Sequence, residues 1–191
     1  MTIETDPPLD RSDADLVVRA RSDRDAFGQL YDVYYPRIFR HCLRRLFLRC
    51  VAEDITSDVF LRIAGQMRDF AGTTHDDFIR WAHAITTNVI NAYLRQNQRR
   101  SRLLEEATRQ KAARDADQVA NSANLSALDW PRVYEALLDL DLRDQAIVTL
   151  RFFEDMSHDR IASILDMYPG AVRTALSRAL ERLRRVLRVP S

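Results

Sequence analysis

A repeating apolar pattern in residues 157–188 limits the possible folds more than any other part of the sequence. Ile161, Ile164 and Leu165 share one side of a short predicted helix. A longer helix follows, with apolar residues at steps of three and four: Val172, Leu176, Leu180, Leu183 and Leu187. Between them, Asp166 tolerates a left-handed backbone and Pro169 suits a first helical turn. Two short amphipathic helices across a tight turn form a helix-turn-helix.

The outer face of the longer helix is polar and basic. Four side chains lie opposite the apolar residues, in the first half of the helix: Arg173, Thr174, Ser177 and Arg178. This half of a recognition helix meets base edges in the major groove of DNA. Residues 167–191 contain six Arg and one Glu, a net charge of +5. An Arg-rich helix is often only a solvated face, so the partner helix and the turn are what favour DNA binding.

The charge of the chain is segregated rather than large. The 191 residues carry a net charge of +1, yet residues 129–166 hold nine acidic and four basic side chains, a net −5. Cys42 and Cys50 lie in an apolar stretch without metal-ligand spacing, which predicts reduced core residues and no metal site. No signal peptide or membrane-length apolar run is present, which predicts a cytoplasmic chain without membrane insertion.

Residues 51–64 predict a helix with a buried seam and an acidic edge. The seam consists of apolar residues at four-residue steps: Val51, Ile55, Val59 and Ile63. Beside this seam lie three acids, Glu53, Asp54 and Asp58. Phe60 and Leu61 lie next to them and are expected to be exposed. Such an edge is either solvated or turned to a basic partner. In the second case the acids steer the encounter and the apolar side chains supply affinity.

Residues 78–100 predict a longer helix, preceded by a Gly- and Thr-rich loop. Its expected buried stripe is Phe78, Trp81, Ile85, Val89 and Ala92. Its expected outer face is Arg80, His83, Thr87, Asn88, Asn91, Arg95, Arg99 and Arg100. Amides and hydroxyls can read base edges, and Arg can bind phosphate. This face is therefore a second candidate surface for nucleic acid.

The whole chain is predicted to be all-α, with two small helical domains joined by a flexible linker. Residues 1–12 are polar and predict a disordered leader. Residues 13–100 form the first domain, in which Pro36 is expected to kink or restart a helix. The apolar pattern breaks after Leu104, so residues 101–127 predict a linker, with helix-favouring composition to about residue 114. Residues 128–191 form the second domain, which contains the helix-turn-helix.

Two segments resemble the extracytoplasmic-function (ECF) class of bacterial RNA polymerase sigma factors. They are AEDITSDVFLR in the first domain and SHDRIASILDMYPGAVRTALSRA in the second. The resemblance spans about residues 13–187. It implies a promoter-specificity subunit that is not an enzyme by itself and needs no cofactor. The sequence departs from the family at Ala64, where a tryptophan is common, at Ala92, where Asp is frequent, and at Ala175, where Arg is frequent.

The resemblance also implies which residues meet each partner. Core RNA polymerase would be bound, at the clamp of its largest subunit, by Glu53, Asp54, Asp58, Phe60 and Leu61. The non-template strand of the downstream (−10) promoter element would be held by Thr73, Thr74, Asn88, Asn91 and Arg95. The upstream (−35) element would be read by Arg173, Thr174, Ser177 and Arg178. Whether an anti-sigma factor is a further partner is left open.

Two alternatives remain at this point. An autonomous helix-turn-helix regulator would need a dimerisation segment and a two-fold operator, and no convincing dimerisation segment is visible. An all-helical enzyme could use Asp54, Asp58 and His75 at a metal, although ligand-spacing signatures are lacking. The four glycines of the chain provide no phosphate-binding loop.

Overall fold

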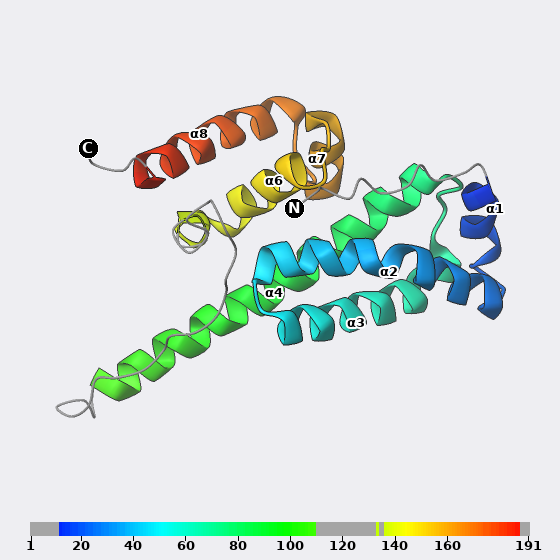
Figure 1. The fold of residues 1–191 in the computed structure, drawn as a ribbon, viewed down its shortest axis with the longest axis horizontal. Helices are drawn as coiled ribbons and strands as arrows, with labels where there is room; N and C mark the ends of the chain where they lie inside the picture. Colours follow the sequence, from blue (N-terminus) through cyan, green and yellow to red (C-terminus); the bar gives the residue numbers. More distant parts are fainter. Residues whose placement is uncertain (1–11, 110–132, 134–135, 188–191) are drawn as a thin grey trace, which may run out of the picture.

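The computed structural model describes residues 12–109, 133 and 136–187, and within these ranges every regular element is helical (Figure 1). The elements are α1 Ser12–Arg19, α2 Arg24–Leu46, α3 Arg49–Gln66, the 3-10 helix η1 Met67–Asp69, α4 His75–Arg109, α6 Leu142–Phe152, α7 His158–Leu165 and α8 Pro169–Leu187. An all-α chain with two helical domains is thus confirmed. The expected leader lies outside the described residues except for Ser12. In the expected linker, residues 101–109 continue α4 and residues 110–127 lie outside.

The first helical stretch breaks at residues 20–23 and not at Pro36, so the expected restart of the helix at Pro36 was wrong. Asp23 caps α2, because its side chain accepts a hydrogen bond from the Asp25 N–H at 2.9 Å. α2 then continues through Pro36 between the buried Tyr34 and Ile38. A mid-helix proline costs about 3 kcal/mol or more, whereas each large apolar side chain contributes roughly 1.5–3 kcal/mol on burial. Core packing on both sides therefore outweighs the local penalty.

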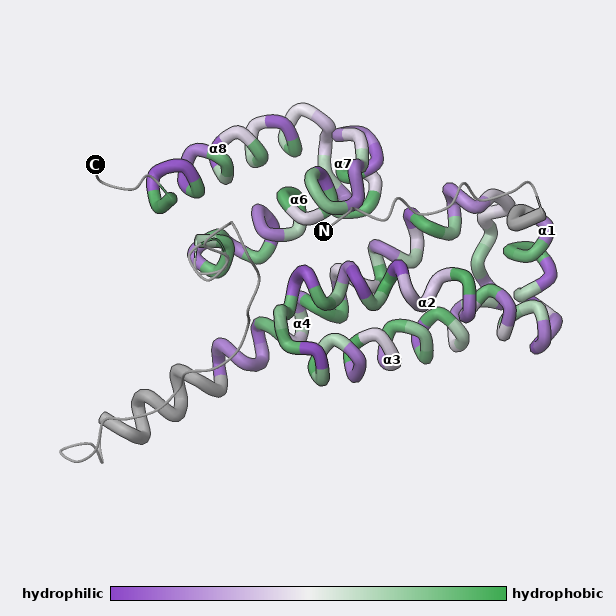
Figure 2. Tube along the Cα trace, in the orientation of Figure 1, coloured by the Kyte–Doolittle hydropathy of each residue, from purple (hydrophilic) through white to green (hydrophobic). Residues whose placement is uncertain are grey.

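The facing surfaces of α2, α3 and α4 form the core of the first domain (Figure 2). Its fully buried side chains include Leu30, Ile38, Val59, Ile63, Phe78, Ile79 and Ile90. The predicted stripe of α4 is confirmed at Phe78 and Val89 but does not include Ala92, which is exposed. Because α4 packs against both α2 and α3, its buried arc is wider than a stripe with one neighbour.

A pair of buried histidines joins α2 to α4. His83, predicted to project outward, is fully buried, and its ring lies edge-on to His41 with centroids 4.8 Å apart. Burial is the main cause that lowers the pKa of both rings. His41, Arg37 and Arg160 lower the pKa of His83 further, whereas a hydrogen bond with Glu154 opposes the shift at His41. Both imidazoles are therefore neutral at pH 7.

The second domain contains the predicted helix-turn-helix. Asp141 caps α6 by accepting hydrogen bonds from two backbone N–H groups at 3.0 and 2.8 Å. Ser157 caps α7 in the same way at 3.2 Å, as expected. α7 ends at Asp166 in the left-handed region, with φ of 52°, and α8 begins at Pro169. Local cap and turn chemistry thus sets the corner that aims α8.

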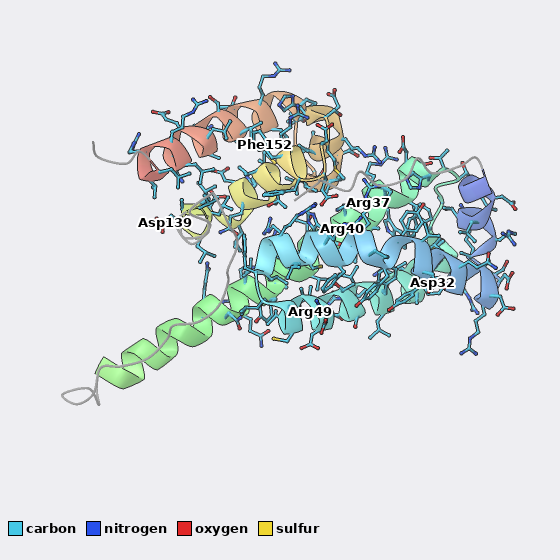
Figure 3. All side chains as sticks on the ribbon, viewed as in Figure 1. Asp32, Arg37, Arg40, Arg49, Asp139 and Phe152 are labelled. Carbon is cyan, nitrogen blue, oxygen red and sulfur yellow. The ribbon has the colours of Figure 1, made fainter. Side chains whose placement is uncertain are left out.

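The second domain rests directly on the first (Figure 1). α7 lies against α4, and α6 lies against α2. Arg37 and Arg40 belong to the part of α2 that lies next to the second domain in Figure 3. The sequence did not predict this contact between the domains, in which Arg44 meets residues more than 100 positions away.

The two cysteines differ in their environments. Cys42 is fully buried, and burial raises the pKa of its thiol to about 11. Cys50 is exposed, so the expectation that it is a core residue was wrong. None of the helices in the described part of the chain is both long enough and apolar enough to cross a membrane.

Candidate nucleic-acid and partner interfaces

The outer face of α8 presents all four side chains predicted for base contact. Exposed on this face are Arg173, Thr174, Ser177 and Arg178. Buried on the opposite face are Val172, Leu176 and Ala179. The Thr174 hydroxyl donates to the Gly170 carbonyl oxygen at 3.0 Å, so it is left to accept a further hydrogen bond. α8 can therefore lay a polar and basic face into a groove of DNA without exposing its apolar side.

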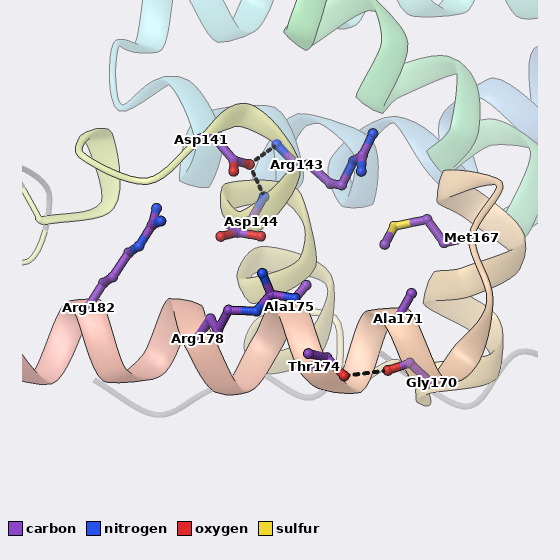
Figure 4. Close-up of a pocket in the computed structure, with 10 residues that line it drawn as sticks. All are labelled: Asp141, Arg143, Asp144, Met167, Gly170, Ala171, Thr174, Ala175, Arg178 and Arg182. Carbon is purple, nitrogen blue, oxygen red and sulfur yellow. Dashed lines mark hydrogen bonds between the residues drawn. The ribbon is translucent and has the colours of Figure 1, made fainter.

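A groove of about 410 Å³ separates α6 from the first half of α8 (Figure 4). Asp141 and Asp144 line its α6 side, and Arg178 and Arg182 line its α8 side. Burial and the charge of Asp141 raise the pKa of Asp144, while Arg182 and Arg178 act in the opposite direction. The two arginines thus lie within electrostatic range of the acidic end of α6. Arg182 was not among the predicted contacts, although its position four residues after Arg178 would have indicated it.

The predicted acidic edge lies on the exposed side of α3. Glu53 pairs with Arg49 at 2.9 Å, and Asp58 pairs with Arg62 at 3.2 Å. Asp54 is exposed, and no ion pair within the described residues holds it. Exposed pairs four residues apart on a helix contribute only about 0.3–0.5 kcal/mol. A basic partner could therefore replace Arg49 and Arg62 at little cost.

Phe60 does not lie on this acidic surface, which corrects the expectation that it is exposed. It is 4% exposed, and the rings of Tyr31 and Tyr35 lie 4.7 and 6.0 Å from its own. Leu61, the next residue, is 72% exposed. The reason is geometric, because successive residues on a helix are rotated by about 100°. Phe60 follows the buried Val59 and reaches the two tyrosines on α2.

The predicted polar face of α4 is only partly free. Asn88 and Arg95 are exposed. Thr87, predicted to project outward, is 3% exposed. Asn91 is half-buried, and its Oδ1 accepts a hydrogen bond from Nη2 of Arg45 at 3.0 Å. Arg45 is 4% exposed, and burial lowers its pKa to about 10. The Asn91 carbonyl group is thus committed to a buried cation, which leaves its NH₂ group for another partner.

The loop before α4 is held by a reciprocal cap that the sequence reading missed. The Thr74 hydroxyl donates to Oδ2 of Asp77 at 2.7 Å and accepts from the Asp77 N–H at 3.1 Å. The Thr73 N–H donates to the same carboxylate at 3.3 Å. These bonds, above all that of the Thr74 hydroxyl, lower the pKa of Asp77. Thr74 therefore starts α4 in a capping-box arrangement, while Thr73 keeps its side chain exposed.

The metal-enzyme alternative finds no support in this arrangement. Asp54, Asp58 and His75 do not form a group that could hold a metal ion, and neither does any other set of three or more His, Cys, Asp or Glu among the described residues. His75 instead starts α4, where its ring stacks on Tyr34 and shares a hydrogen bond with the Tyr34 hydroxyl. Asp54, Asp58 and His75 therefore do not form one site.

Two known domains match this chain in consecutive order. Sigma-70 region 2 matches residues 30–100, from α2 into α4. Sigma-70, region 4 matches residues 131–183, which include α6, α7 and most of α8. The acidic face of α3 and the polar face of α4 fall in the first match, and the recognition face of α8 falls in the second.

Relatives of known role cover most of the chain. The ECF RNA polymerase sigma factor BldN of Streptomyces coelicolor is 32% identical over 177 residues, which are 91% of this chain but only 65% of BldN. The ECF RNA polymerase sigma factor SigW of Bacillus subtilis is 25% identical over 174 residues, which are 88% of this chain and 92% of SigW.

Two solved structures share the fold. CnrH, in complex with the cytosolic domain of CnrY, has a TM-score of 0.66 at 22% identity, over 94% of this chain and 99% of that chain. Sigma factor RpoE from Bartonella quintana, in complex with the anti-sigma factor NepR, has a TM-score of 0.62 at 20% identity, over 86% and 98%. The two domain matches and the sequence relatives show that the chain belongs to the ECF family of RNA polymerase sigma factors.

Proposed function

We propose that this chain binds core RNA polymerase and directs transcription initiation by recognising two promoter elements. One observation carries the proposal. A single chain presents an exposed recognition face on α8 and, on a separate domain, an exposed acidic face on α3. The first suits DNA, and the second repels DNA and suits a basic protein. A subunit that brings a polymerase to a promoter needs both surfaces.

The upstream (−35) element is assigned to α8. Arg173 and Arg178 can each form paired hydrogen bonds with guanine in the major groove. Thr174 and Ser177 add short hydroxyl groups that can contact either bases or phosphates. Arg182 extends the basic side of this face along the groove with α6.

The downstream (−10) element is assigned to α4 and the loop before it. Asn88 can pair with the edge of an unstacked base, and Arg95 can bind phosphate. Extruding a base costs a few kcal/mol, so the site needs several polar groups. Thr73 has a free side chain, whereas Thr74 and Asn91 would contribute only the hydrogen-bonding capacity left by Asp77 and Arg45.

Core polymerase is assigned to the α3 face, and in particular to the basic helical clamp of the largest subunit. Asp54 is available at once, while Glu53 and Asp58 would exchange their weak partners for those of the clamp. Leu61 supplies an exposed apolar anchor. Phe60 supports this surface from beneath through Tyr31 and does not contact the clamp itself.

The test is run-off transcription with purified core polymerase and a promoter library. We expect transcripts from a defined promoter class only when this chain is present. Asp54→Arg combined with Asp58→Arg should abolish both capture of core polymerase in a pull-down and transcription. The matched control is Asp15→Arg with Asp32→Arg, which makes the same charge change at exposed positions on α1 and α2. Normal core capture by the first double variant would remove the α3 face from the proposal.

The competing function is that of an autonomous regulator. A gel shift separates the two, because a sigma factor should bind promoter DNA tightly only after core polymerase is added. Tight binding of a two-fold operator by the free chain would favour the regulator. In the proposed role the chain works with RNA polymerase in the cytoplasm and has no catalytic activity of its own. An anti-sigma factor is a further proposed partner.

A further inference from the structure

We propose that the chain holds itself in a closed, inactive form through a latch between its two domains. The latch consists of Glu154, at the corner between α6 and α7, inserted among three side chains of α2: the two cations Arg37 and Arg44, and the neutral His41. A second contact, between Arg160 of α7 and Asp76 of α4, accompanies it. The consequence for promoter binding rests on the function proposed above, whereas the closed form itself does not.

The Glu154 carboxylate is enclosed by the other domain. Its Oε1 lies 3.2 Å from Nη1 of Arg44 and 3.3 Å from Nδ1 of His41, and its Oε2 lies 3.9 Å from Nε of Arg37. The Glu154 side chain is only 5% exposed. The neighbouring Asp155 is 96% exposed and pairs only weakly, with Arg151 of its own domain at 3.4 Å. One of two adjacent acids has thus been taken into the interface.

Two further contacts fix the geometry. Nη1 of Arg44 also donates to the carbonyl oxygen of Phe153 at 3.0 Å, and its guanidinium group lies 5.4 Å from the Phe153 ring. Nη2 of Arg160 lies 3.0 Å from Oδ1 of Asp76. Arg44 therefore binds a side chain, a backbone carbonyl and an aromatic ring of the second domain at once, which a chance surface encounter does not produce.

The energetics make this contact switchable. A buried carboxylate is tolerated only while it is paired, because it has lost its water. When the domains separate, Glu154 and its cations regain hydration, so the closed and open forms can lie close in free energy. Removing one partner of a buried ion pair leaves the other charge buried and uncompensated. The closed form is therefore more sensitive to the loss of one charged partner than it would be if apolar contacts alone held it.

The closed form is incompatible with simultaneous binding of both promoter elements. Asp76 lies two residues after Thr74, in the first turn of α4, and it is bound to the first helix of the helix-turn-helix. The −35 and −10 elements lie about 25 base pairs apart, or roughly 85 Å at about 3.4 Å per base pair of B-DNA. In the closed form α8 packs on α7 and α7 lies against α4, so the surfaces on α8 and α4 are held too close together to reach both elements. Opening of the latch is therefore required before the chain can occupy a promoter.

The test measures the distance between the domains. Spin labels are placed on the native Cys50 of α3 and on a second cysteine at Glu181→Cys of α8, since Cys42 is buried and unreactive. The wild type should give one short, narrow distance distribution. Glu154→Gln should shift the ratio of closed to open molecules by about 100-fold or more and give a long, broad distribution. The matched control Asp155→Asn removes the same charge one residue away and should leave the distribution unchanged.

A charge exchange provides an independent arm. Arg160→Glu or Asp76→Arg should each shift the population toward the open form by up to about fivefold, because this pair is largely exposed. The double exchange should restore the original distribution, which a variant that merely misfolds cannot do. A long distance in the wild type, or an unchanged distance in Glu154→Gln, would overturn the latch.

Run-off transcription separates this inference from the proposed function. A distance shift in Glu154→Gln with no promoter-dependent transcription by any variant would support the latch and overturn the proposed function. An unchanged distance with normal transcription would do the reverse.

Discussion

The neighbours Phe60 and Leu61 offer the sharpest test of the structure, because the sequence placed both at the partner surface and the fold separates them. Phe60→Ala removes a buried ring that packs on Tyr31 and Tyr35. Such a truncation costs about 3–5 kcal/mol, which lowers the Tm of a domain of this size by more than about 10 °C. Leu61→Ala removes a side chain that is 72% exposed, so its free energy of unfolding should change by less than about 0.5 kcal/mol.

The two variants should exchange their ranking when binding is measured. Circular dichroism during thermal and urea denaturation gives the stability of each variant, and a pull-down gives its capture of core polymerase. We expect Leu61→Ala to fold normally and to capture core polymerase less well. Phe60→Ala should capture it normally at temperatures where the domain is still folded. A Phe60→Ala protein that keeps its Tm and loses core capture would place the ring at the interface and contradict its role in the core.

Three further outcomes are expected. Arg178→Ala should weaken binding to the upstream element by about 1–3 kcal/mol in a gel shift with core polymerase, and Arg185→Ala, which pairs with Glu181 farther along α8, should have a smaller effect on all sequences alike. Asn88→Ala should reduce strand opening in permanganate footprinting of the open complex while upstream binding persists; a parallel loss of both would make Asn88 structural. The pKa values of His41 and His83 are lowered from 6.5 in the folded chain. Burial of the two rings in their neutral form therefore costs no stability above about pH 6.5, and the free energy of unfolding decreases as the pH falls below that value. The urea midpoint should therefore drop between pH 6.5 and 5.5, and His83→Leu should reduce that drop.

The helix-turn-helix could be predicted because the interactions that define it are local. Ser157 caps a helix three residues away, Asp166 accepts a left-handed backbone, and Pro169 starts the next helix. Each of these preferences acts within one turn of chain, so it is readable without knowledge of the neighbours. The same holds for the recognition face of α8, whose opposite side packs against a single small domain. Its four predicted side chains are all exposed.

Predictions failed where several parts of the chain compete for one side chain. Helical spacing assigns one apolar stripe, but α4 has neighbours on more than one side, so His83 and Thr87 are buried outside that stripe. Phe60 is drawn inward by tyrosines that lie on another helix. Asn91 is occupied by Arg45, a residue 46 positions away. None of these partners is visible at the spacing of one helix.

The contact between the domains is the extreme case. Glu154 meets Arg44 across 110 residues of chain and His41 across 113. In the sequence, Glu154 and Asp155 are two adjacent acids at the end of a helix, with nothing local to distinguish them. Only the docking of α6 and α7 on α2 and α4 buries one and leaves the other in water. Local propensity acts over one or two helical turns, whereas burial and pairing of charges depend on which surfaces meet once the chain has folded.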